Sequence, residues 1–149
     1  MVSLFPDFKE FLKLLNSSKV RYLLIGGYAV NFHGHHRTTG DMDIWIAVDP
    51  DNAQRISATL QQFGFSIASV PPEMFLETGR IFRFGVKPVR IELLTSPSGI
   101  DFETCYSRRV EAEIDGVAIP VLALQDLREN KRAAGRPKDE DDLLNLPSA

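Results

Sequence analysis

The N-terminal segment alternates apolar and polar positions with the period of an α-helix. Its apolar residues recur three or four positions apart and would share one helix face: Phe8, Phe11, Leu12 and Leu15. Pro6 is suited to the first turn of a helix, where the missing N–H costs no hydrogen bond. The pattern therefore predicts a helix over Pro6–Asn16 that packs on a core through this face.

Short apolar runs after this helix predict the strands of a sheet. Tyr22–Ile25 is typical of a buried strand that ends at a glycine pair, and Tyr28–Phe32 of a short helix. Asp41–Val48 begins by alternating charged and apolar side chains, as a strand with one buried face does. An Asp-Pro pair then predicts the start of a helix over Pro50–Phe63.

The second half of the chain contains five predicted strands and two predicted helices. The strands are Phe65–Val70, Ile81–Phe84, Val89–Leu94, Val110–Ile114 and Val117–Val121, and the helices are Ala123–Ala134 and Lys138–Leu146. The last two strands flank an Asp-Gly pair, which is a strong signal for a hairpin. Because strands and helices mix without a regular β-α-β rhythm, the predicted fold class is α+β.

Composition is that of an ordinary globular protein, since 44% of the 149 residues are hydrophobic and 25% are charged. We expect a single domain over residues 1–149 with its own core. Cys105 is the sole cysteine, which excludes an intrachain disulfide and favours a reducing, cytoplasmic setting. No signal peptide and no membrane span are expected. The net charge of −3 argues against broad nonspecific binding of nucleic acid, while a local basic patch leaves that partner class open.

Three carboxylates are placed to share one face of the predicted sheet. Asp41 and Asp43 lie two positions apart on a strand, so they point the same way with Cα atoms about 6.5 Å apart. Glu92 joins them if its strand lies beside theirs. Clustered carboxylates repel one another unless a cation neutralises them, and Mg²⁺ prefers such oxygen ligands. The alternative is that the two aspartates are solvated strand residues without a ligand.

A glycine pair interrupts the chain between the first strand and the short helix. Gly26 and Gly27 permit a tight turn and allow a phosphate to approach the backbone closely. Backbone amides at the start of the following helix would favour an anion. The sequence matches neither a Walker motif nor a dinucleotide fingerprint, and a plain tight turn is the alternative interpretation.

These segments together resemble the minimal nucleotidyltransferase family. The resemblance rests on the glycine pair, the run Arg37–Ile44 with its Asp-x-Asp, the carboxylate of Glu92 and the basic run Asn130–Asp139. This family belongs to the polymerase-beta-like superfamily, which includes small stand-alone bacterial enzymes of the toxin type. The implied fold is a mixed sheet with helices packed mainly on one face and the metal carboxylates on the open face.

The resemblance implies a metal-dependent transfer reaction. Asp41, Asp43 and Glu92 would hold two Mg²⁺ ions, for which Mn²⁺ can substitute, and would be the catalytic residues. An acceptor hydroxyl would attack the α-phosphate of an NTP, pyrophosphate would leave, and Glu92 could help to take the acceptor proton. Relatives often carry aspartate where this chain has Glu92, and His35-His36 precede Arg37 where an arginine and a proline are common.

The implied nucleotide contacts are the two glycines and five polar residues: Gly26, Gly27, Arg37, Thr39, Lys131, Arg136 and Lys138. For the basic run, which also contains Arg132, a solvated helix end is the alternative. Asp139 and Asp142 either orient these cations or begin the last helix, and for Asp142 the second interpretation is favoured.

Three further features have two interpretations each. Trp45 lies in phase with Asp43, so it either stacks on a base or covers the sheet. The run His33–His36 forms either a loop near the substrate mouth or, less favoured, a zinc site. Cys105 is expected to be a small core residue rather than a nucleophile.

The sequence thus predicts an enzyme that moves an NMP from an NTP to a hydroxyl on a protein, an RNA end or a small molecule. By resemblance, its partners include a cognate antitoxin or a second copy in a homodimer. The alternatives are a catalytically silent module on the same fold that binds a nucleotide or a protein, and a purely structural subunit.

Overall fold

The computed structural model describes residues 4–148. In chain order the elements are α1 (Pro6–Ser17), β1 (Tyr22–Ile25), α2 (Gly26–Phe32), β2 (Asp41–Ile46), α3 (Pro50–Phe63), the 3₁₀ helix η1 (Pro72–Leu76), β3 (Ile81–Phe84), β4 (Arg90–Leu94), α4 (Phe102–Ser107), β5 (Val110–Ile114), β6 (Val117–Val121), α5 (Leu124–Ala134) and α6 (Pro137–Asn145).

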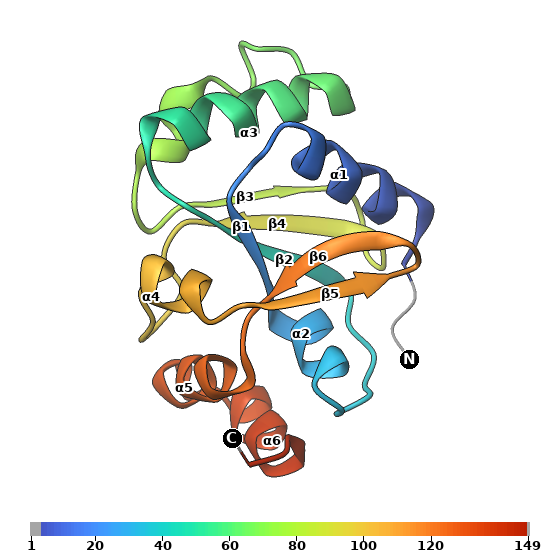
Figure 1. Cartoon of the computed structure of the whole chain (residues 1–149), viewed down its shortest axis with the longest axis vertical. Coiled ribbons are helices and arrows are strands. Elements are labelled where there is room, and N and C mark those ends of the chain that lie inside the picture. Colours follow the sequence, from blue (N-terminus) through green and yellow to red (C-terminus); the bar gives the residue numbers. More distant parts are fainter. Residues whose placement is uncertain (1–3, 149) are drawn as a thin grey trace.

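Six strands form one mixed sheet in the order β3-β4-β2-β1-β6-β5 (Figure 1). Strand β2 is antiparallel to β1 but parallel to β4, and β1 is parallel to β6. The two outer pairs, β3–β4 and β5–β6, are antiparallel. The α+β class with a mixed sheet is confirmed, and β2 and β4 become neighbours although a long connection separates them.

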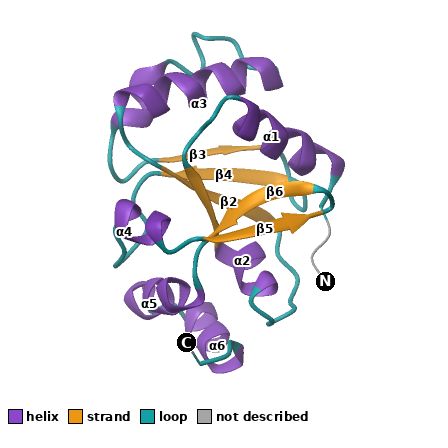
Figure 2. Cartoon of the chain, viewed as in Figure 1, coloured by secondary structure: helices purple, strands orange, loops and turns teal. Residues whose placement is uncertain are grey.

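Helices α1 and α3 cover one face of the sheet (Figure 2). Met42 and Ile44 of β2 are fully buried in the same hydrophobic core as Phe11 of α1 and Leu60 of α3. Each buried side chain of this size contributes roughly 1.5–3 kcal/mol relative to exposure, so this packing stabilises the sheet. The opposite face of β2 carries Asp41 and Asp43, followed by the buried Trp45.

Two segments differ from the predicted elements. Phe65–Val70 is a turn followed by η1, and its apolar residues serve the core without pairing as a strand: Val70 is fully buried and Phe65 packs edge-on against Phe84. Helix α4 was not predicted. It starts where Asp101 accepts a hydrogen bond from the Thr104 amide at 3.0 Å, an N-cap signal visible in the sequence.

Trp45 covers the sheet beneath α4 and does not face a ligand. It is 2% exposed, its Nε1 donates to the carbonyl of Thr95 at 3.3 Å, and its ring packs edge-on against Phe102. Cys105 in α4 is buried, and burial raises the pKa of its thiol to about 12. The core interpretation of Cys105 is therefore confirmed. Within the described part of the chain, the structure has no helix long and apolar enough to cross a membrane.

Candidate active site

Two parallel strands bring the three predicted carboxylates onto one face of the sheet. In the β2–β4 ladder Asp43 is paired directly with Glu92, and Asp41 with Arg90. Because side chains alternate along a strand, both aspartates lie on the face opposite the fully buried Met42. The condition set by the sequence, that the strand of Glu92 lie beside that of Asp43, is met.

Asp43 lies in a partly enclosed position among negative charges. Its Oδ1 atom is buried and accepts no hydrogen bond. Burial, together with the carboxylates of Glu92 and Asp41, raises the pKa of Asp43 to about 7, and the positive charge of Lys138 opposes the shift. A divalent cation would give Oδ1 a partner and relieve the repulsion, so the residues present fit a metal site.

Two arginines neutralise the other carboxylates in this structure. Arg90 donates from Nε and Nη2 to the two oxygens of Asp41, at 2.5 Å and 3.1 Å. Arg83 on β3 donates from Nε to Oε1 of Glu92 at 2.8 Å. The hydrogen bonds from Arg90 lower the pKa of Asp41. Neither arginine was predicted as a site residue, although Arg90 and Glu92 alternate with buried residues along one strand.

The glycine pair lies directly against the carboxylate strand. Gly26 has a φ of +66°, and a Cβ atom added there would lie 2.2 Å from Oδ2 of Asp43. A Cβ atom on Gly27 would lie 2.6 Å from the hydroxyl of Thr39. Both positions thus exclude a side chain, and the turn brings the backbone that starts α2 into contact with Asp43.

An asparagine that sequence reasoning missed holds the loop between α2 and β2. Asn31 donates from Nδ2 to the carbonyls of Gly27 and Arg37, at 2.8 Å and 2.9 Å, and its Oδ1 accepts from the Arg37 amide. The hydroxyl of Thr39 donates to the carbonyl of Asp41 at 3.1 Å. These bonds fix the path by which the loop passes from the glycine turn to β2.

A buried ion-pair network joins this loop to α5 and α6. Asp142 accepts from Nε and Nη2 of Arg37, at 2.7 Å and 2.8 Å, and lies 3.0 Å from Nζ of Lys131. Asp139 pairs with the same lysine at 3.2 Å and with Arg136 at 2.6 Å. The side chains of both aspartates are at most 1% exposed. The preference for Asp142 as a simple helix-start residue was wrong, because its partner Arg37 is distant in the sequence.

The network also keeps both aspartates ionised. Burial alone would raise the pKa of Asp142, but hydrogen bonds from Arg37 and Lys131 hold it below its usual value. Hydrogen bonds from Arg136 and Lys131 outweigh burial in the same way and lower the pKa of Asp139. Lys131 therefore has two anionic partners that hold its ammonium group in place.

A cleft of about 440 Å³ opens between the carboxylate face of the sheet and helices α5 and α6. All ten site residues predicted from the sequence line this cleft: Gly26, Gly27, Arg37, Thr39, Asp41, Asp43, Glu92, Lys131, Arg136 and Lys138. The cleft has further lining residues that were not predicted, and they include Ile81, Arg83, Leu94, Ser96, Pro97 and Asn130. Arg132 does not line it and pairs instead with Glu129 on its own helix.

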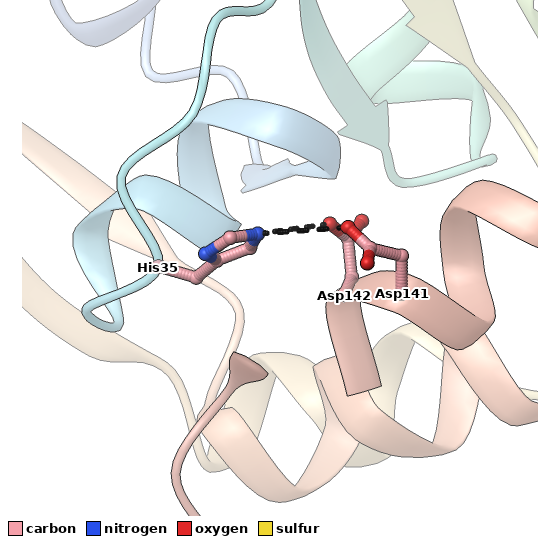
Figure 3. Close-up of side chains that lie close together, drawn as sticks. All are labelled: His35, Asp141 and Asp142. Carbon is pink, nitrogen blue, oxygen red and sulfur yellow. Dashed lines mark ion pairs between the residues drawn. The ribbon is translucent and has the colours of Figure 1, made fainter. Parts of the chain in front are cut away.

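None of the histidines in the loop His33–His36 lines the cleft, although the next residue, Arg37, does. Figure 3 shows the ring of His35 pointing at Asp141 and Asp142, with Nε2 at 4.0 Å and 3.8 Å from their oxygens. The ligand atoms of these three residues all lie within 4.8 Å of one another, a spacing that a metal ion could bridge. Asp142 already accepts from Arg37 and Lys131, so the cluster belongs to the buried ion-pair network.

Solved structures of nucleotidyltransferases and of a nucleotidyltransferase-like protein share the fold of this chain. A candidate nucleotidyltransferase of Thermotoga maritima matches with a TM-score of 0.59 and 18% identity, over 92% of this chain and 88% of its own. Lincomycin-bound lincosamide antibiotic adenylyltransferase LnuA matches with a TM-score of 0.56 and 17% identity, over 97% and 96% of the two chains. An antigenic nucleotidyltransferase-like protein of Paracoccidioides brasiliensis matches at 0.58 and 18%, over 97% and 77%.

The chain belongs to the aminoglycoside-2''-adenylyltransferase family, whose model matches residues 7–146. No curated protein sequence matches it. The family and the fold confirm a nucleotidyltransferase enzyme of the polymerase-beta-like type. Enzymes of this kind generally use a divalent metal ion.

Proposed function

We propose that this enzyme transfers an NMP from an NTP to a hydroxyl acceptor with the help of Mg²⁺. The observation that carries the proposal is the direct pairing of Asp43 with Glu92, with a buried oxygen of Asp43 left without a partner beside the glycine turn. An arrangement that concentrates like charge costs stability unless a cation is bound during function. A catalytically silent module would have no use for it.

Asp41, Asp43 and Glu92 would hold two Mg²⁺ ions, or Mn²⁺ in their place, and act as the catalytic residues. Such ions neutralise the phosphates and the developing negative charge when bound. The chain itself supplies the arrangement: β2 and β4 hold the carboxylates on one face, and α1 and α3 pack the other face rigidly. Glu92, at the outer end of the carboxylate row, would take the proton of the acceptor hydroxyl.

The glycine turn beside Asp43 would hold the triphosphate. Gly26 and Gly27 let phosphate oxygens approach backbone amides, and Thr39 lies in contact with this turn. Asp142 holds the side chain of Arg37 by hydrogen bonds. The Nη1 atom of Arg37 lies 3.4 Å from the position that a Cβ atom added at Gly27 would occupy. This guanidinium edge is thus presented beside the turn.

Three further cations extend this phosphate site along α5 and α6. Lys131, Arg136 and Lys138 line the cleft opposite the carboxylates. Lys131 and Arg136 both pair with Asp139, so their side chains are already held in place. This lowers the conformational entropy lost when they bind phosphate. We propose ATP as the nucleotide, because the family to which the chain belongs is named for adenylyl transfer.

Calorimetric titration of the four NTPs, with and without Mg²⁺ or Mn²⁺, tests this function. Wild type is expected to bind ATP only with metal, and the double variant Asp41→Asn/Asp43→Asn to lose that binding. Asp51→Asn, an exposed aspartate at the start of α3 that does not line the cleft, is the control and should bind as wild type does. A double variant that binds MgATP unchanged would remove the metal assignment.

The proposal also covers the domain organisation, the cellular compartment and the partners of the enzyme. We propose that residues 1–149 act as a single domain in the cytoplasm, where the buried Cys105 stays reduced. A role as the enzyme of a toxin–antitoxin pair, with a cognate antitoxin or a homodimer as assembly, stays a prediction. Growth arrest on expression of wild type but not of Asp43→Asn is its test.

A further inference from the structure

The direction from which the acceptor reaches the site follows from the order of the strands. In-line transfer puts the attacking and leaving oxygens on opposite sides of the α-phosphate. The glycine turn follows β1, and the sheet then continues through β2 and β4 to β3. If Gly26 and Gly27 hold the triphosphate, the acceptor therefore approaches from the side of β4 and β3. This step rests on the proposed function.

Three cations lie around the carboxylates on that side: Arg83 lines the cleft, whereas Lys87 and Arg90 are not among its lining residues. Arg83 projects from β3 with a side chain that is 52% exposed, and Arg90 from β4 with one that is 28% exposed. The exposed Lys87, in the turn between these strands, lies over Gly40, where an added Cβ atom would meet its side chain at 2.8 Å.

The same side offers no free carboxylate to a positively charged acceptor. Among the described residues that line the cleft, the only acidic ones are Asp41, Asp43 and Glu92, which the metal ions would occupy. Glu77, near the start of β3, pairs with Arg80 at 3.3 Å. An aminoglycoside carries several ammonium groups at neutral pH, so it would meet like charges here, and juxtaposed like charges cost several kcal/mol.

Metal binding would also change what the arginines do. Their present partners are two of the carboxylates that would hold the metal ions, at 2.5 Å from Arg90 to Asp41 and 2.8 Å from Arg83 to Glu92. Once those carboxylates are neutralised by metal, both guanidinium groups lose their anionic partners while remaining beside the acceptor path. Arginine in this state is suited to bind phosphate through two hydrogen bonds at once.

We propose that Arg83, Lys87 and Arg90 form an acceptor site for a hydroxyl compound that carries phosphate, in place of the polycationic acceptor for which the family is named. The acceptor oxygen forms a bond to the α-phosphorus and the bond from that phosphorus to the β-phosphate oxygen breaks. Pyrophosphate leaves with the electron pair, and the hydroxyl proton passes to Glu92 and then to water. The phosphate of the acceptor positions the hydroxyl and does not react.

Binding experiments with an unreactive nucleotide test this acceptor site. Wild type is loaded with Mg²⁺ and α,β-methylene ATP, and three probes are titrated: an oligoribonucleotide with a free 3′-hydroxyl, ribose 5-phosphate and kanamycin. We expect at least one phosphate-bearing probe to bind, to bind more weakly without metal, and kanamycin not to bind. Preference for the oligoribonucleotide identifies a nucleic-acid end as the source of the phosphate, and preference for ribose 5-phosphate identifies a sugar phosphate.

Charge reversal on β3 gives a matched comparison. Arg83→Glu is expected to weaken binding of the phosphate-bearing probe by about tenfold or more. Probe binding is measured with each variant saturated by Mg²⁺ and α,β-methylene ATP, because the substitution also removes the partner of Glu92. Arg132→Glu is the control, because Arg132 is equally exposed at 52%, pairs with one glutamate and does not line the cleft. That variant should bind the probe as wild type does.

The outcomes separate this inference from the proposed function. If wild type binds MgATP but neither phosphate-bearing probe, or binds kanamycin in preference to both, the acceptor site is wrong and the nucleotide site stands. If Arg83→Glu and Arg132→Glu weaken probe binding equally, the effect is general electrostatics and the assignment of β3 is wrong. If wild type does not bind MgATP, both proposals fail together.

Discussion

Arg90 and Asp41 occupy paired positions on the parallel strands β4 and β2, and the guanidinium grips both oxygens of the carboxylate. Arg90 and a metal ion would therefore compete for the carboxylate of Asp41. Arg90 neutralises Asp41, and it must release this carboxylate when metal binds.

Replacing Arg90 by glutamine is expected to tighten the binding of Mn²⁺ in the absence of nucleotide. The metal would no longer compete with a partly exposed ion pair, and such pairs are worth enough to change affinity by up to about fivefold. Calorimetry or the electron paramagnetic resonance signal of free Mn²⁺ measures the change, with Arg132→Gln as the control. Weaker Mn²⁺ binding by Arg90→Gln would instead make the arginine a group that positions Asp41 for the metal.

Gly26→Ala is expected to destabilise the protein and disrupt the metal site together. The new Cβ atom would lie 2.2 Å from the Asp43 carboxylate, on a residue whose φ is +66°. Strain and overpacking together should cost about 2–4 kcal/mol in the free energy of unfolding. Urea unfolding measures this loss, and Mn²⁺ titration measures the metal site.

Gly116→Ala is the control for this substitution. It also has a positive φ, +77°, but an added Cβ atom there meets nothing within 4 Å. It should therefore cost only the backbone strain, about 1 kcal/mol. Equal losses for the two variants would mean that contact with Asp43 adds nothing.

Substitutions of two neighbouring aspartates in α6 should differ sharply in their effect on the free energy of unfolding. Asp142→Asn removes a buried charge from between Arg37 and Lys131, and breaking a buried pair from one side costs about 3–5 kcal/mol. Asp141→Asn changes a side chain that is 66% exposed and should cost less than about 0.5 kcal/mol. Urea unfolding of both variants measures the difference, and a value near zero would show that the network does not stabilise the fold.

The same pair predicts how stability depends on pH. The pKa of Asp142 in the folded protein is held below its usual value of 3.8, so the folded state favours the ionised form. Its contribution is fully present above the unfolded pKa and is lost as the pH falls through the folded pKa. The gap in stability between wild type and Asp142→Asn should be constant from pH 7 to about pH 5 and narrow below pH 4. A gap that widens on acidification would contradict the ionised network.

Trp45 offers a simple test that no base stacks on it. It is the sole tryptophan, it is buried beneath α4, and it does not line the cleft. Its fluorescence should be almost unchanged by MgATP but should shift to longer wavelength when urea unfolds the protein. Strong quenching by ATP at concentrations that saturate the site would mean that the base reaches this ring.

The chain order and periodicity were sufficient to place the helix face of α1, the glycine turn and the Asp-x-Asp strand. Each of these depends on neighbours within a few positions: the spacing of Asp41 and Asp43 alone puts them on one face. The basic run could be assigned to the cleft only through the resemblance to nucleotidyltransferases. Even so, all ten predicted site residues line one cleft.

Relationships between segments far apart in the chain are set by the tertiary structure. The parallel pairing of β2 with β4 sets Glu92 beside Asp43 and Arg90 beside Asp41, a partner 49 positions away. The ion pair between Arg37 and Asp142 joins residues 105 positions apart. Local pattern shows which face a side chain is on but not which strand or helix lies opposite. That choice is made by burial of the whole core and by the need of each buried charge for a partner.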